Sequence, residues 1–116
     1  AQQLERLSTM AWRDFSLALT EAYTRQGYVV SAFEGVGADL QLVKAGRTTL
    51  VSCKRWKAAN LGVESLRELV AARQRQDASL CTCITLGQLA DTANTYAKAE
   101  AVQVIDAQAL ATLMLT

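Results

Sequence analysis

The sequence predicts an α/β domain with a mixed central sheet flanked by helices, in the order α-β-β-β-α-β-α-β-α. Two observations carry this prediction. Short apolar runs rich in β-branched residues alternate with amphipathic helical segments. An Ala45-Gly46 pair also separates two of the apolar runs, which is typical of a β-hairpin. A hairpin followed by β-α-β units requires antiparallel and parallel strands in one sheet.

The chain has 116 residues and 51% hydrophobic residues, which fits one domain with a buried core. We expect residues 1–116 to be a single domain and a fragment of a longer protein, since the chain starts with alanine. No apolar run approaches the ~20 residues of a membrane span. The net charge of +1 means that any binding to nucleic acid needs a local basic patch.

Residues 9–27 are predicted to form a helix with one apolar face. That face carries Trp12, Phe15, Leu19, Ala22 and Tyr23. Ser8 or Thr9 can cap the start of this helix, and Gly27 is expected to end it.

The next three segments are predicted to be strands: residues 28–33, 38–44 and 47–54. The last two form the hairpin, and pairing across its turn sets Asp39 opposite Ser52. Lys54 lies two residues beyond Ser52, so both point to one face of the sheet and Cys53 points to the other. Asp39 and Lys54 then become diagonal neighbours, close enough to share a site.

The second half alternates helices and strands. Residues 63–76 are predicted to form an amphipathic helix, and residues 79–85 a strand that is buried on both faces. An alanine-rich helix over 88–100 and a short strand over 102–105 follow. Asp106 is expected to cap the final helix.

Two interpretations of Asp39 remain open. A carboxylate in an apolar strand is costly unless it is paired or binds a metal. Asp39 is therefore either in an ion pair with Lys54 or Arg47, or a ligand for Mg²⁺ together with the main-chain carbonyl of Cys53. Lys54 either extends into solvent or orients the attacking water and stabilises charge on a phosphate.

A basic cluster follows directly: Arg55, Trp56 and Lys57. These residues either contact DNA or consist of a packed aromatic ring between two solvated cations. The chain has no histidine, which excludes imidazole catalysis and histidine metal sites. Its three cysteines lie in apolar runs and are expected to be buried, reduced thiols.

The segments GADL and LVSCKRWK, after the helical sequence WRDFSLALTEAYTRQGYVV, resemble the Mrr-like restriction endonuclease domain of the PD-(D/E)xK nuclease superfamily. The likeness extends through GVESLREL, ITLG and VQVIDAQAL, and so over nearly the whole chain. It implies a restriction-endonuclease-like fold, DNA as the partner and Mg²⁺ as the cofactor for phosphodiester cleavage.

The resemblance also implies roles for single residues. The family's metal-binding aspartate corresponds to Asp39 and its lysine to Lys54. Glu21 takes the place of a helical glutamate that often faces the site. The family's glutamine or glutamate position holds Ser52, a short side chain that binds metal poorly, so we expect weakened cleavage.

Two function classes follow. The first is a Mg²⁺-dependent DNA endonuclease with a degenerate site. The alternative is a catalytically inactive nuclease fold that binds DNA or another protein. Homodimerisation and further domains or a membrane anchor outside this segment stay open. The expected location is the cytoplasm, or the cytoplasmic face of a membrane for an anchored protein.

Overall fold

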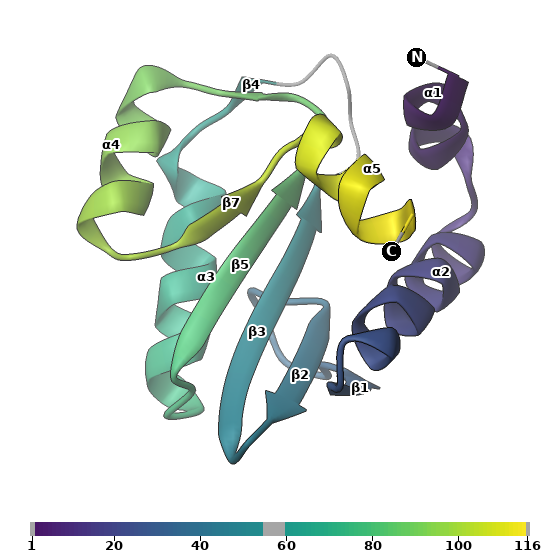
Figure 1. Ribbon diagram of the computed structural model, residues 1–116. Helices are drawn as coiled ribbons and strands as arrows, with labels where there is room; N and C mark the ends of the chain where they lie inside the picture. Colours follow the sequence, from purple (N-terminus) through teal and green to yellow (C-terminus); the bar gives the residue numbers. More distant parts are fainter. Residues whose placement is uncertain (1, 55–59, 116) are drawn as a thin grey trace.

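A five-stranded mixed sheet separates two layers of helices (Figure 1). The computed structural model describes residues 2–54 and 60–115. In chain order, the elements are α1 (Gln2–Thr9), α2 (Trp12–Arg25), β1 (Val29–Ala32), β2 (Leu40–Lys44), β3 (Arg47–Lys54), β4 (Asn60–Leu61), α3 (Val63–Arg75), β5 (Leu80–Thr85), β6 (Gln88–Leu89), α4 (Asp91–Ala99), β7 (Gln103–Ile105) and α5 (Ala107–Leu115). No helix in the described part of the chain is long and apolar enough to cross a membrane.

The strand order in the sheet is β1-β2-β3-β5-β7. The first three strands are antiparallel neighbours, whereas β3, β5 and β7 run parallel. The predicted mixed sheet is therefore confirmed. Because the parallel strands need crossovers, α3 connects β3 to β5 and α4 connects β5 to β7.

The predicted hairpin is present with the predicted register. Gln41 pairs with Leu50, and the ladder ends where Leu40 pairs with Val51. Ala45 and Gly46 form the turn, and both have positive φ values, of 52° and 77°. This conformation matches the twist of a two-residue hairpin, which explains why so short a connection closes the strands.

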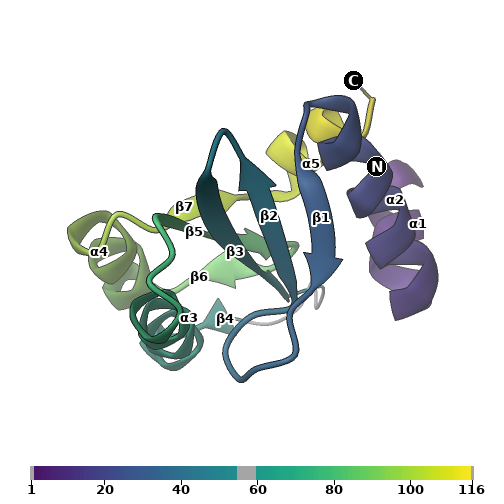
Figure 2. The ribbon, with the colours of Figure 1, turned by 90° about the horizontal axis from the view of Figure 1, so that it is seen from below.

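Each face of the sheet has its own apolar core (Figure 2). On one face, α1, α2 and α5 cover Val51 and Cys53 of β3 together with Ile84 of β5. On the other, α3 and α4 cover Leu50 of β3 and Cys83 of β5. Neighbouring residues of β3 thus belong to opposite faces, as the two-residue period of a strand requires.

The N-terminal prediction of one helix over 9–27 is wrong at its start. The chain forms α1, breaks at extended Ala11 and then begins α2 without a side-chain cap. The hydroxyl groups of Ser8 and Thr9 donate to the carbonyl of Glu5 within α1 instead of capping α2. Gly27, with a φ of 95°, follows the end of α2 as expected.

The second departure is a two-stranded parallel sheet of β4 and β6. The sequence predicted that residues 88–100 form one helix, but Gln88 and Leu89 pair with Asn60 and Leu61. The helix α4 therefore begins only at Asp91. Two-residue strands are too short to show periodicity, so this pairing was not predictable from the sequence pattern.

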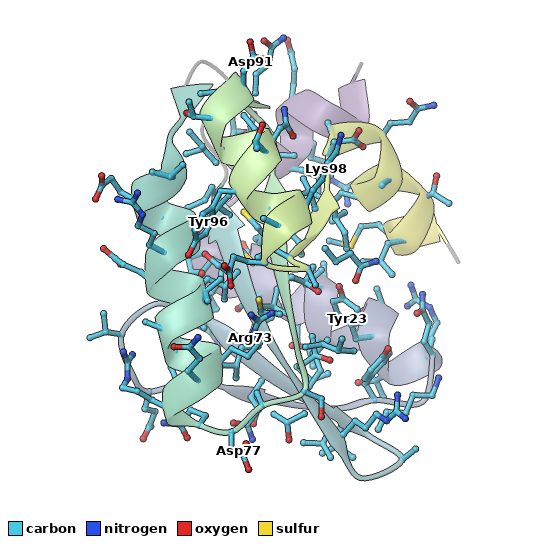
Figure 3. All side chains as sticks on the ribbon, turned by 90° about the vertical axis from the view of Figure 1, so that its left-hand side faces the viewer. Tyr23, Arg73, Asp77, Asp91, Tyr96 and Lys98 are labelled. Carbon is cyan, nitrogen blue, oxygen red and sulfur yellow. The ribbon has the colours of Figure 1, made fainter. Side chains whose placement is uncertain are left out.

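The α3/α4 layer is held together by the side chain of Arg73, labelled in Figure 3. Its guanidinium donates to the main-chain carbonyl of Glu100 at 2.9 Å and lies 3.8 Å from the Glu100 carboxylate. It also lies 3.5 Å from the sulfur of Cys81. A cation at the C-terminal end of α4 satisfies a helix carbonyl, and it couples α4 to α3 and β5.

Candidate active site

The backbone around Asp39 is held by strands on both sides. The N–H of Asp39 donates to the carbonyl of Val51 at 2.7 Å, and its own carbonyl accepts from the N–H of Phe33 at 3.0 Å. Asp39 lies just before β2 and is half-buried. The regular ladder ends at the Leu40–Val51 pair, so the ladder pairing expected between Asp39 and Ser52 does not form.

The carboxylate of Asp39 is directed at the next strand. Its Oδ2 accepts a hydrogen bond of 2.7 Å from the main-chain N–H of Cys53. Hydrogen bonds to carboxylates are short and strong when the acceptor is ionised. The predicted ion pair of Asp39 with Lys54 or Arg47 is absent among the described residues, and the main-chain donor takes its place.

The carbonyl of Cys53 lies on the same edge of β3 as that N–H. The next residue, Lys54, uses its own carbonyl to accept from the N–H of Leu86 at 3.0 Å, beyond β5. Since successive residues of a strand direct their main-chain groups to opposite sides, the N–H and carbonyl of Cys53 both point toward Asp39. The carboxylate and this carbonyl are therefore neighbours.

The side chains of β3 divide as predicted. Cys53 packs in the core under α2, whereas Ser52 and Lys54 belong to the opposite face with Leu50. Ser52 is 2% exposed, so its hydroxyl lies below the surface. Lys54 is half-buried at the end of the strand.

The buried thiol of Cys83, on the neighbouring strand β5, is under the electrostatic influence of both charged groups. Burial raises the pKa of the Cys83 thiol to about 11, while Lys54 acts to lower it and Asp39 to raise it. Both charges therefore act on one buried sulfur atom on the α3/α4 face. The parallel pairing of Ser52 with Cys83 creates this arrangement, and it depends on a contact between segments distant in sequence.

Glu21 is not part of this group. The helix α2 turns Leu19, Ala22 and Tyr23 into the core on the Cys53 face, which leaves Glu21 exposed. The sheet separates that layer from the face that carries Ser52 and Lys54. The structure therefore does not bring Glu21 together with Ser52 and Lys54.

The donors available to a metal ion are few. Among residues 2–54 and 60–115, no group of three or more His, Cys, Asp or Glu side chains gathers as a metal site. The carboxylate of Asp39 and the carbonyl of Cys53 are hard oxygen donors of the kind that Mg²⁺ accepts. Two such donors fit an ion that keeps several waters and takes further ligands from substrate phosphates.

The other predicted site residues have different outcomes. Arg55, Trp56 and Lys57 lie outside the described residues. The three cysteines are free and buried, in line with the prediction of buried thiols. Cys53 contributes through its main chain, because its side chain packs on the opposite face.

Comparison with known proteins identifies the family and supports the fold. The family model Mrr_cat, described as restriction endonuclease, matches residues 7–114. The chain is also similar to a crystal structure described as "Protein of Unknown Function AF1548", with 12% sequence identity and a TM-score of 0.64. The match covers 76% of this chain and 54% of the solved chain, so this chain spans about half the length of that protein. No curated protein matches the chain.

Proposed function

The chain belongs to the restriction endonuclease family that the Mrr_cat model describes, and from this premise we propose that it binds DNA and cleaves phosphodiester bonds with Mg²⁺. The observation that carries the proposal is the 2.7 Å hydrogen bond between the Asp39 carboxylate and the N–H of Cys53. It holds an acid against β3 at the residue that precedes Lys54.

In this proposal, the Asp39 carboxylate and the Cys53 carbonyl hold the Mg²⁺ ion. When bound, the ion supplies Lewis acidity toward a phosphate oxygen. The N–H of Cys53 keeps the carboxylate in one orientation, so Asp39 needs no rearrangement to act as a ligand.

The proposed role of Lys54 is electrostatic. Lys54 is half-buried at the end of β3, and in this proposal its ammonium group donates hydrogen bonds to the attacking water or to the phosphate. Partial burial strengthens its interaction with developing negative charge relative to a fully solvated lysine. Because the chain has no histidine, no imidazole competes for this role.

Ser52 favours the second candidate function, an inactive nuclease fold that binds DNA. Ser52 points to the same face as Lys54, where a longer acidic side chain would reach the metal ligands. Its hydroxyl is short and buried. The absence of a three-ligand cluster among the described residues agrees with this alternative.

Plasmid nicking with Mg²⁺ or Mn²⁺ tests the proposal. We expect the parent domain to nick slowly and Lys54→Ala to abolish nicking. Lys98→Ala is the matched control, because it removes the same charge from an exposed position near the end of α4. Nicking that persists in Lys54→Ala would refute the role of this lysine.

Substitution of Ser52 separates the two candidate functions. We expect Ser52→Glu or Ser52→Gln to raise Mg²⁺-dependent nicking above the parent level, because a third oxygen donor then faces the ion. Circular dichroism verifies that each variant folds. A folded Ser52→Glu variant that binds DNA but neither binds Mg²⁺ nor nicks would instead support the inactive binding module.

A further inference from the structure

A cavity with both polar and apolar lining residues lies near the candidate active site. It has a volume of about 350 Å³ and lies at the carboxyl ends of β5 and β7 beside α4. Its lining includes Thr85, Gln88, Asn94 and Val104. Thr85 is paired with Lys54 across the parallel β3–β5 ladder, so the cavity begins one strand away from the lysine. The carboxyl ends of parallel strands are where open α/β sheets bind ligands.

Rigid elements position the two amide side chains of this cavity. Gln88 lies on β6, which pairs with β4, and the N–H of Ala90 donates to the carbonyl of Leu61 at 2.9 Å. The turn before β6 is held by Thr85, whose hydroxyl donates to the carbonyl of Gly87 and accepts from its N–H. Asn94 lies in the first half of α4, the helix that Arg73 couples to β5.

The side chains that line the cavity indicate the class of ligand that it can bind. Gln88 and Asn94 are exposed, and each carboxamide offers both donors and an acceptor. The described residues of the lining include no lysine or arginine, and their polar side chains are mainly neutral. Asp106 also lines the cavity, and its carboxylate accepts a hydrogen bond from the N–H of Ala109, which caps α5.

From this arrangement we propose that Gln88 and Asn94 contact base edges of DNA beside the phosphate held at Lys54, and so determine sequence preference. The inference rests on the proposed function and extends it to specificity. Carboxamides pair with adenine through its N6 and N7 atoms in the major groove, so the expected preference is for A·T pairs. Lys54 acts on the backbone, whereas the two amides contact bases.

Selection from a pool of short duplexes with a randomised centre tests the inference. Binding is measured in EDTA so that cleavage does not interfere, and the bound fraction is sequenced. We expect the parent to enrich A·T pairs at one or two positions. Gln88→Ala and Asn94→Ala should each lower the enrichment at one position by roughly 5- to 150-fold while they retain non-specific affinity.

Gln74→Ala is the matched control. Gln74 is an exposed amide near the end of α3. Figure 3 shows Asp77, just after that helix, and Asp91, at the start of α4, at opposite ends of the molecule. Gln74→Ala should therefore leave the preference unchanged.

Failure of the inference can be distinguished from failure of the proposed function. A parent that nicks or binds DNA without base preference overturns the inference alone, as do Gln88→Ala and Asn94→Ala variants with the parent's preference. A parent that neither binds nor nicks DNA overturns the proposed function and the inference with it.

Discussion

Replacement of Gly37 by alanine should destabilise the domain because this glycine brings the loop before Asp39 against α3. Gly37 has a φ of 101°, which residues with a Cβ rarely adopt. A Cβ atom here would fall on the main-chain oxygen of Glu68, 2.9 Å from its carbonyl carbon and 3.2 Å from the Cβ of Ala72. The obstacle is helix backbone, which cannot rotate away as a flexible side chain can.

The magnitude follows from two costs. Positive φ costs a residue other than glycine about 1–2 kcal/mol. Overpacking against a fixed neighbour adds about 1–3 kcal/mol, for a total of about 2–5 kcal/mol. Gly46→Ala is the matched control, since Gly46 also has positive φ, of 77°, but has nothing within 4 Å of the added Cβ. It should lose only about 1–2 kcal/mol.

Urea denaturation followed by circular dichroism measures both variants. The effect of alanine on the unfolded chain is similar in the two proteins and largely cancels in the comparison. We also expect Gly37→Ala to reduce nicking at a temperature where it remains folded, because Asp39 lies only two residues further on. Equal free energies of unfolding for the two variants would refute the packing argument.

Two further predictions concern DNA binding and pH. Arg55→Ala with Lys57→Ala should weaken duplex binding and lower its salt dependence without unfolding the domain, since phosphate contacts release counterions; an unchanged affinity and slope across a salt series would contradict this. The free energy of unfolding should fall between pH 9 and about 11. Burial raises the pKa of Cys83 from 9.0 to about 11, so in this range the thiol ionises in the unfolded chain but stays protonated in the folded one. The loss is about 3 kcal/mol at most. Cys83→Ala should flatten this decline in denaturation measured against pH, with a remainder from the raised pKa values of Cys81 and Tyr23; a slope identical to the parent's would exclude Cys83 as a cause.

The hairpin, and the distribution of its side chains between the two faces of the sheet, were predictable from the local sequence pattern. The Ala45-Gly46 turn sets the register, and the two-residue period then separates Ser52 and Lys54 from Cys53. The buried β5 strand and the Asp106 cap were predictable for the same reason, because each depends on a few consecutive residues.

Other features depended on contacts between distant segments. The break between α1 and α2 has no proline or glycine to signal it, and the hydroxyl groups of Ser8 and Thr9 suit a cap equally well in isolation. The β4–β6 pairing is too short for periodicity. The outward position of Glu21 follows from which side of α2 meets the sheet.

By itself, the sequence determined the α/β class, the hairpin and the presence of an acid and a lysine at its open end. Only the tertiary structure decided how these groups meet. The hydrogen bond from Cys53 to Asp39 forms where β2 leaves its ladder with β3, and the influence of Asp39 and Lys54 on Cys83 requires β5 to pair in parallel with β3. Periodicity sets which face a side chain takes, because it is a property of one strand. The residues that a side chain contacts on that face depend on packing between segments that are distant in the sequence.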